Sequence, residues 1–180
     1  AACTKCQYAA NLEVASSPPA PRSADPEQTP AHERVHTPSQ RSIGEVSAFL
    51  GAAPHKFLKS LLYVADKQVV MAVVRVDHEV NEIKLARALG VGEVFMASAE
   101  DVQKATGAAV GFAGPVGFSG RLIVDGSAAS VVDGITGANQ TDHHLNHVQP
   151  GRDFTGQVCD IRSVKEGDLC PECGSPLGIY

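Results

Sequence analysis

Apolar and polar residues alternate in several short segments in the middle of the chain. Residues 57–64 alternate and are mostly apolar, and residues 69–76 repeat this after the turn Ala65-Asp66-Lys67. This pattern predicts two neighbouring buried strands. Further short strands are expected near residues 94–97, 122–124, 128–132, 144–148 and 158–161.

Three segments have the spacing of helices and end at a glycine: residues 42–50, 77–89 and 98–106. The first begins with the capping box Ser42-Ile43-Gly44-Glu45, in which the serine and glutamate side chains satisfy free backbone N–H groups. Strands outnumber helices and do not alternate regularly with them. We therefore predict an α+β fold, a mixed sheet or barrel with flanking helices.

The chain divides into four parts by composition. Residues 15–39 hold a Pro-rich stretch and scattered charges, with no Phe, Tyr, Leu or Ile, so we expect a flexible linker that cannot bury enough apolar surface to fold. Residues 40–165 form the expected compact domain. Residues 1–14 and 166–180 are expected to be the two junctions that carry the cysteine pairs described below.

Composition limits the classes of function. The chain has 180 residues, 43% of them hydrophobic, a mean hydropathy of −0.04 and a net charge of −5. No apolar run approaches the ~20 residues of a membrane-spanning helix. An acidic chain binds nucleic acid poorly by itself, because phosphate contacts supply most non-specific affinity. Any nucleic-acid substrate would have to be delivered by another domain.

Two CxxC motifs lie at opposite ends of the chain, Cys3-Thr-Lys-Cys6 and Cys170-Pro-Glu-Cys173. A two-residue spacer lets one turn present two sulfurs to one metal, and two such pairs make a tetrahedral zinc site. If they share one Zn²⁺, the chain ends must meet, as in a domain inserted into a larger protein. The alternatives are four unrelated reduced thiols or two disulfides.

The fifth cysteine, Cys159, is expected in a buried strand, and an odd cysteine count favours a reducing cytosol. The chain begins at Ala1 without a methionine, so we expect it to be a piece of a longer protein.

Lys59 is an unusual residue for its position, because it lies within a mostly apolar strand. If alternation holds, its side chain shares a face with Phe57, Leu61 and Tyr63. Such a lysine either reaches solvent at the edge of the strand or binds an anionic group.

Two other segments carry candidate chemistry. The loop Gly111-Phe112-Ala113-Gly114-Pro115 is typical of an ordinary turn or of a cradle whose backbone N–H groups bind an oxyanion or phosphate. His143 and His144 follow Asp142, but neighbouring residues of a strand face opposite ways. We therefore expect one histidine to line a site and no shared metal. For Asp125-Gly126, an ordinary hairpin turn is a strong alternative to a functional role.

The sequence resembles the editing insertion domain of bacterial prolyl-tRNA synthetase, within the YbaK-like family of aminoacyl-tRNA deacylases. The match keeps the family's order over nearly the whole chain apart from the linker. The matching segments are Tyr8-Ala9-Ala10-Asn11, Lys59-Ser60-Leu61, the run from Arg75 to Leu85, Thr106-Gly107, the run from Val110 to Gly117, Gly137-Ala138-Asn139, Pro150-Gly151-Arg152-Asp153 and Glu166-Gly167-Asp168.

The resemblance implies roles for particular residues. Lys59 would hold the phosphate of the terminal adenosine or the reacting ester, and Gly111 and Gly114 would act beside it in catalysis. Gly111 and Pro115 are similar to the two ends of the family's G-x-x-x-P loop. The expected contacts to the aminoacyl end are Phe112, Pro115, Asp125 and His144. The neighbouring His143 leaves open which histidine lines the pocket.

The implied function is hydrolysis of alanine mischarged onto the proline tRNA. A host synthetase, expected to be a cytoplasmic homodimer, would deliver the aminoacyl end of the tRNA. No Ser-His-Asp or Cys-His nucleophile is present, so water is the expected nucleophile and the chemistry needs no cofactor; zinc would be structural. The alternatives are a free-standing deacylase that acts in trans and a zinc-stapled module without catalytic activity.

Overall fold

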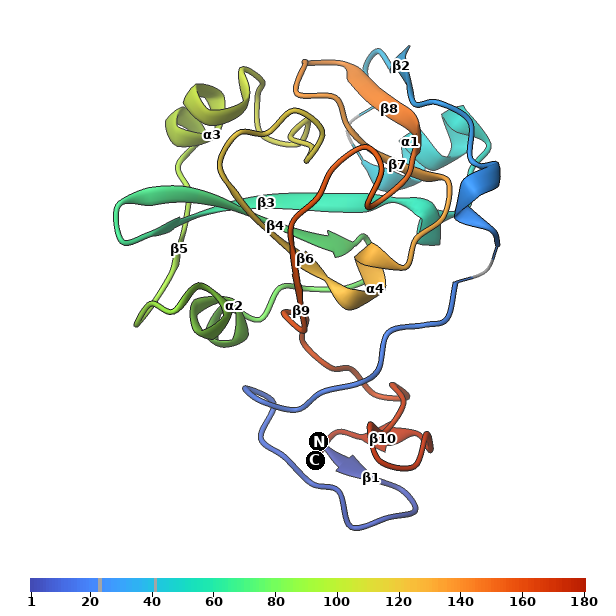
Figure 1. Cartoon of the computed structure of the whole chain (residues 1–180), viewed down its shortest axis with the longest axis vertical. Helices are drawn as coiled ribbons and strands as arrows, with labels where there is room; N and C mark the ends of the chain where they lie inside the picture. The colour runs from blue at the N-terminus through green and yellow to red at the C-terminus, as the bar shows by residue number, and fades with distance from the viewer. Residues whose placement is uncertain (23, 41) are drawn as a thin grey trace.

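Five strands form the central sheet of this computed structural model, which describes residues 1–22, 24–40 and 42–180. Their order is β5-β3-β4-β6-β9, and a second sheet has the order β2-β8-β7 (Figure 1). The strands are β1 (Ala2–Cys3), β2 (Glu33–His36), β3 (Leu58–Ala65), β4 (Gln68–Arg75), β5 (Phe95–Met96), β6 (Arg121–Asp125), β7 (Gly134–Gly137), β8 (His143–Val148), β9 (Gln157–Cys159) and β10 (Leu177–Gly178). The helices are α1 (Ile43–Leu50), α2 (Glu82–Leu89), α3 (Ala99–Thr106) and α4 (Gly126–Ala129), with 3₁₀ turns at Pro26–Gln28 and Pro54–Lys56.

The central sheet is mixed, which confirms the α+β prediction. The strands β3 and β4 form the expected antiparallel hairpin, paired from Leu58 with Arg75 to Ala65 with Gln68. The strands β6 and β9 then add in parallel. The barrel alternative is wrong, because the strands of the described residues fall into separate sheets that do not close.

The two faces of the central sheet bury different partners. On one face, Tyr63, Val74 and Leu85 belong to a cluster that α2 covers. On the other face, Leu58 and Leu62 pack with Val102 of α3 and Leu145 of β8. Alternation along β3 therefore assigns successive side chains to two separate cores. No helix within the described residues is long and apolar enough to cross a membrane.

Two local predictions were wrong near the end of β6. The expected strand at 128–132 is instead the end of the short helix α4 and the turn that follows it. The N-cap of α4 is Asp125, whose Oδ1 accepts the Ser127 backbone N–H at 2.9 Å. Asp125-Gly126 is therefore a helix start and not a hairpin turn. The strand β7 was missed because two of its four residues are glycines, which weaken a strand pattern.

The segment 15–39 contains more structure than expected for a flexible linker, because β2 pairs along β8 from Glu33–Asn146 to His36–His143. Arg152 holds the stretch before β2. Its guanidinium donates to the backbone oxygens of Thr29 at 2.6 Å and Pro30 at 2.7 Å. Backbone pairing and the hydrogen bonds of Arg152 thus order a segment that has few apolar residues.

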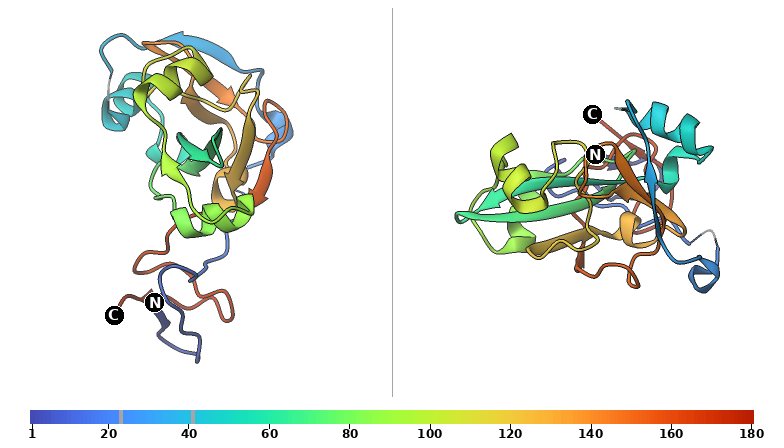
Figure 2. Two further views of the ribbon diagram at one scale, coloured as in Figure 1. Left: turned by 90° about the vertical axis from the view of Figure 1, so that its left-hand side faces the viewer. Right: turned by 90° about the horizontal axis from the view of Figure 1, so that it is seen from above.

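The two chain ends form a separate unit, here called the cysteine lobe (residues 1–14 and 166–180). It lies at one end of the molecule's long axis, with the N- and C-termini side by side (Figures 1 and 2). The strands β1 and β10 pair Ala2 with Gly178 and Cys3 with Leu177. The expected meeting of the chain ends is confirmed.

Candidate functional site

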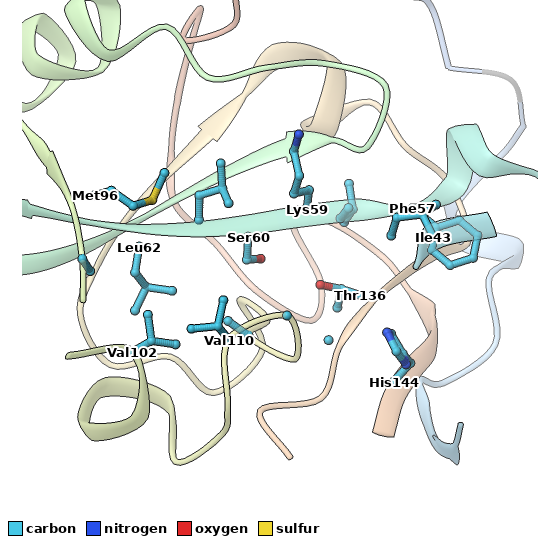
Figure 3. A pocket seen from close by; sticks show the side chains of 16 residues that line it. Ile43, Phe57, Lys59, Ser60, Leu62, Met96, Val102, Val110, Thr136 and His144 are labelled. Atoms are coloured by element: carbon cyan, nitrogen blue, oxygen red, sulfur yellow. The ribbon is translucent and has the colours of Figure 1, made fainter. Parts of the chain in front are cut away.

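A pocket of about 320 Å³ opens beside β3, between the central sheet and the second sheet. Its walls are mostly apolar and include Phe57, Leu62 and Val102. Gly111 lines it from the loop of residues 111–115, here called the glycine loop, and Val110 lines it just before that loop. His144 lines it from β8 (Figure 3). A concave, largely apolar site with a few polar groups is the usual form of a small-ligand pocket.

Lys59 is among the residues of β3 that line this pocket, but its side chain leaves the strand on the opposite face from Ser60 (Figure 3). Its Nζ donates to Glu79 Oε1 at 3.0 Å, and the lysine side chain is 24% exposed. The predicted alternation with Leu61 and Tyr63 therefore holds. The structure does not bring the Lys59 ammonium together with His144.

In the loop from Gly111 to Pro115, Gly111 and Ala113 line the pocket, and Asn139 holds the loop in place. The Gly114 N–H donates to Asn139 Oδ1 at 2.8 Å, and Asn139 Nδ2 donates to the backbone oxygens of Gly114 at 3.0 Å and Val116 at 3.2 Å. Gly114 must be a glycine, because a Cβ there would lie 1.9 Å from the Gly137 oxygen. Two loops distant in sequence thus fix one wall of the pocket.

The backbone N–H groups of this loop are only partly available to a ligand. The Gly114 N–H is bound to Asn139, and the Phe112 N–H donates to the Ala109 oxygen at 3.2 Å. Phe112 turns its ring edge to His144, with the ring centroids 5.9 Å apart. Pro115 is buried behind the loop. An anion cradle formed by several N–H groups of this loop stays a prediction.

His144 is the histidine that lines the pocket, whereas His143 stacks on His36 with ring centroids 4.8 Å apart. The His144 side chain is held by a 2.7 Å hydrogen bond between its Nδ1 and Thr37 Oγ1. Burial, and to a lesser extent the charge of His143, lowers the pKa of His144 below its ordinary value. The imidazole is therefore neutral at pH 7.

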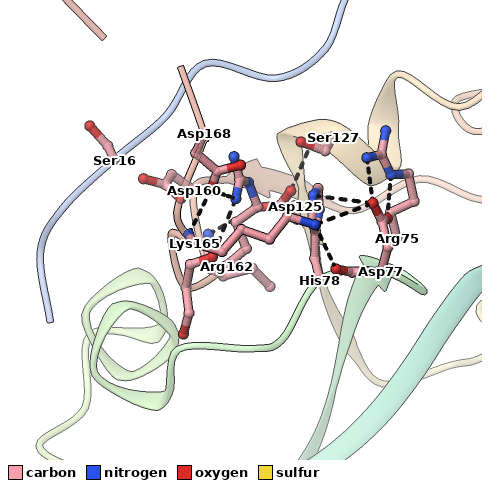
Figure 4. Close-up of polar contacts among 12 residues, drawn as sticks. Ser16, Arg75, Asp77, His78, Asp125, Ser127, Asp160, Arg162, Lys165 and Asp168 are labelled. Atoms are coloured by element: carbon pink, nitrogen blue, oxygen red, sulfur yellow. Dashed lines mark hydrogen bonds and ion pairs between the residues drawn. The ribbon is translucent and has the colours of Figure 1, made fainter. Parts of the chain in front are cut away.

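Asp125 lies outside this pocket, in a polar cluster on the side of the sheet that faces the chain ends (Figure 4). Besides capping α4, its Oδ2 accepts the Ile161 N–H at 3.2 Å. In the same cluster, Arg162 forms an ion pair with Asp168 at 2.6 Å. This contact connects the cysteine lobe to the rest of the chain. The structure thus gives Asp125 structural partners and does not bring it together with His144.

Sequence reasoning missed the two hydroxyl-bearing residues of the pocket, Ser60 and Thr136, and the role of Asn139 as the loop's anchor. Ser60 stands in the apolar strand next to Lys59, and a polar residue on the face that buries Leu58 and Leu62 was the available signal. Thr136 had no such signal, because its strand was not predicted.

The four cysteines of the two CxxC motifs meet in the cysteine lobe. Cys3 Sγ lies 3.5 Å from Cys173 Sγ, Cys6 Sγ lies 3.6 Å from Cys170 Sγ, and all four sulfurs lie within 4.8 Å of one another. All are free thiols, which rules out the disulfide alternative in this structure. Hydrogen bonds from the Ser175 side chain and backbone lower the pKa of Cys173 to about 6. The cluster has the composition of a metal site.

Known proteins with similar sequences indicate which family the chain belongs to. The family described as "Aminoacyl-tRNA editing domain" matches residues 37–154. A proline–tRNA ligase of Moorella thermoacetica is 45% identical over 177 residues, and one of Geobacter sulfurreducens is 48% identical over 172 residues. The alignments cover 97% and 95% of this chain, but only 31% and 30% of those relatives, so the chain spans less than a third of their length.

A solved structure with a similar fold is described as a candidate trans-editing enzyme for prolyl tRNA synthetase. It superposes with a TM-score of 0.67 at 22% identity, over 74% of this chain and 87% of that one. At this identity the likeness shows the fold alone. The family match and the two proline–tRNA ligases show that the chain belongs to the aminoacyl-tRNA editing domain family.

Proposed function

We propose that this chain hydrolyses the ester bond of alanine mischarged onto the proline tRNA, as the editing domain inserted in a prolyl-tRNA synthetase. The observation that carries the proposal is the small apolar pocket, lined by His144 and the glycine loop, in a chain of the aminoacyl-tRNA editing family. Its size and walls suit a short aliphatic side chain.

The need for such a pocket follows from the energetics of selection. A synthetic site built for proline cannot strongly reject alanine, since one or two missing apolar groups are worth only about 1–3 kcal/mol. A second pocket that admits alanine and excludes the larger proline ring corrects the error. The loop wall at Gly114 is rigid, because Gly137 packs directly against it, so the pocket can set a size limit.

Hydrolysis requires water to attack the ester carbonyl carbon, after which the bond from that carbon to the ribose oxygen breaks. The ribose oxygen takes up a proton, and free alanine leaves. Within this pocket the neutral His144 ring forms a wall beside the reacting group, and the glycine loop brings backbone close to it. A neighbouring hydroxyl of the terminal ribose would assist, because it is held next to the ester.

In this proposal, Lys59 binds the tRNA end and does not act on the reacting ester. Its ammonium is on the face of β3 opposite Ser60, beside the largely exposed Glu79. Of the two roles implied by resemblance, contact with a phosphate of the tRNA end is the one this position supports. The negative charge of the chain fits delivery by a host, since a tethered tRNA end reaches the pocket at high effective concentration.

A deacylation assay tests the proposal. The chain should release alanine from alanyl-tRNA for proline and leave prolyl-tRNA intact, and His144→Ala should loosen this selectivity more than it slows alanine release. A folded chain that hydrolyses neither substrate would leave the alternative of a non-catalytic module. The same assay can be run with the tRNA free in solution and with the tRNA held by the parent synthetase. This comparison separates a deacylase that acts in trans from a domain that acts within a host, which we expect to be a cytoplasmic homodimer.

We also propose that Cys3, Cys6, Cys170 and Cys173 bind one structural Zn²⁺, which plays no part in hydrolysis. A tetrahedral ion with Zn–S bonds of about 2.3 Å separates its sulfurs by about 3.8 Å, close to the 3.5 and 3.6 Å found here. The Lys5 and Cys6 backbone N–H groups also donate to Cys3 Sγ at 3.3 and 3.4 Å. These bonds favour the thiolate that zinc requires.

Elemental analysis of protein purified without chelator checks the zinc proposal. One zinc per chain is expected, and Cys3→Ser should abolish it, whereas Cys159→Ser, outside the cluster, should leave it unchanged. Metal-free protein with four thiols that react at the rate of free cysteine would refute the proposal.

A further inference from the structure

Two hydroxyl groups face each other in the pocket without a partner. Ser60 Oγ comes from β3 and Thr136 Oγ1 from the neighbouring β7 (Figure 3). Both oxygens are buried, and neither makes a hydrogen bond within the ranges that the structure describes. Thr136 is 1% exposed. Both side chains point into the space where the proposed substrate would lie.

Unpaired buried hydroxyls are unusual, because folding removes them from water without compensation. Comparable hydroxyls elsewhere in this chain are bonded: Thr37 Oγ1 to His144 at 2.7 Å and Thr29 Oγ1 to Gln149 at 3.1 Å. Among the described residues, one other buried side-chain atom lacks a partner, Nδ1 of His78, which does not line this pocket. The orphan hydroxyls are thus concentrated where a ligand would bind.

We propose that Ser60 and Thr136 bind the α-amino group of the alanyl ester. The inference rests on the proposed hydrolysis and names residues that recognise its substrate. An α-amino group that enters this pocket loses water, and none of the residues that line the pocket is a carboxylate. A hydroxyl suits the task in either protonation state, since it accepts a bond from an ammonium and donates one to a neutral amine.

The position of Lys59 supports this assignment. Its ammonium would repel a positively charged amino group, but it is turned to the opposite face of β3 and paired with Glu79. Lys59 is itself among the residues that line the pocket, but the other lining residues are the neutral His144 and uncharged residues. The pocket therefore offers acceptors to the amino group without a competing cation.

Recognition of the amino group adds a chemical criterion to the size limit. The ammonium of alanine has three N–H donors, whereas that of proline has two and carries a ring carbon in place of the third. A site built to hydrogen-bond a substrate group discriminates strongly against analogues that leave its polar groups unpaired. The two N–H donors of a prolyl ammonium can reach both hydroxyls only when the ring carbon takes the third direction, so these contacts leave the proline ring one orientation in the pocket.

Two esters on the same tRNA test the proposal: alanyl, and propionyl, which has the same carbon skeleton and no amino group. Ser60→Ala and Thr136→Val should each lower kcat/KM on the alanyl ester by roughly 10- to 100-fold, the range for a lost hydrogen bond to a charged group. The loss on the propionyl ester should be at least tenfold smaller. Thr136→Ser, which keeps the hydroxyl, should restore activity, and Thr29→Val serves as a matched control outside the pocket.

The outcomes separate this inference from the proposed function. Equal losses on both esters would overturn amino-group recognition and leave hydrolysis standing, and so would unchanged hydrolysis of the alanyl ester by both variants. Failure of the unsubstituted chain to hydrolyse the alanyl ester would overturn the proposed function itself. Melting curves of each variant show that the comparison is made between folded proteins.

Discussion

The editing body (residues 42–165) and the cysteine lobe are held together by different forces. The body buries three apolar clusters around its central sheet. The lobe has two-residue strands and leaves Leu12, Leu169 and Tyr180 exposed. Burial of apolar surface stabilises the first, whereas the second brings together four thiols. Substitutions in one region should therefore spare the other.

The two regions also differ in chemistry. None of the residues that line the pocket belongs to the cysteine lobe, and the lobe joins the body through polar contacts such as Arg162 with Asp168. A metal in the lobe can fix where the chain ends emerge. It cannot contact a substrate in the pocket without a rearrangement of the fold.

The largest effect is expected from Gly114→Ala, a substitution that disturbs the editing body and leaves the cysteine lobe unchanged. The new Cβ would lie 1.9 Å from the Gly137 oxygen, so the glycine loop and Gly137 must move apart and the wall that they form must change. A displacement of about 1 Å can lower a rate about 100-fold, and we expect at least that loss of alanyl-tRNA hydrolysis. Zinc content should stay at one per chain. Gly92→Ala is the matched control, because a Cβ there meets nothing within 4 Å; hydrolysis by Gly114→Ala at the control's rate would contradict the proposed wall.

Cys170→Ser should produce the converse result. Cys170 is 1% exposed and belongs to the thiol cluster, so its loss should release the metal and open the lobe, whose own apolar core is small. We expect backbone amides of residues 1–14 and 166–180 to exchange with deuterium much faster, while hydrolysis of alanyl-tRNA changes less than about threefold. Cys159→Ser should change neither measurement. A large loss of hydrolysis by Cys170→Ser would show that the two regions are coupled.

Lys59→Ala should have an intermediate effect on the body. If the ammonium binds a tRNA phosphate, its removal should raise KM about tenfold, with a smaller change in kcat and a weaker dependence on salt. Lys59→Arg should retain most of the affinity, and Glu79→Gln, which frees the ammonium from its partner, should not weaken it. A loss confined to kcat would instead place Lys59 at the reacting ester.

Much of the body could be predicted because its signals are local. The hairpin of β3 and β4 was predicted from long alternation, and the helices ending at Gly51, Gly90 and Gly107 from their caps. The segment 128–132 was misassigned because five mostly apolar residues fit a strand or a helix equally well. There, the Asp125 cap decided in favour of a helix.

The site was harder to predict because it depends on contacts between distant segments. The spacing of the cysteines predicted their meeting, but nothing in the sequence placed Thr136 opposite Ser60 or Asn139 against Gly114. Lys59 was chosen from its position in an apolar strand and Asp125 by resemblance; Asp125 lies outside the pocket, and the Lys59 side chain leaves β3 on the face opposite Ser60. Which face of a sheet a residue occupies follows from alternation; which cavity that face lines follows only from the fold.

The smallest expected effect concerns pH and belongs to the body. Burial alone would raise the pKa of Asp153, but hydrogen bonds from Arg152 and the Gln149 N–H hold it at about 2. The pKa is about 3.9 in an unfolded chain, so the ionised carboxylate stabilises the fold fully above pH 4 and loses this effect as the pH falls towards 2. Linkage sets an upper limit of about 2.6 kcal/mol on the contribution.

Urea unfolding of the unsubstituted chain and of Asp153→Asn, followed by a probe in the body, measures this contribution. The difference in free energy of unfolding between the two proteins should be about 2 kcal/mol at pH 6 and should shrink steadily below pH 4. Arg152, which Asp153 orients, also holds the backbone before β2, so that stretch should loosen first. A difference that stays constant from pH 6 to pH 2 would mean that Asp153 acts by packing and not through its charge.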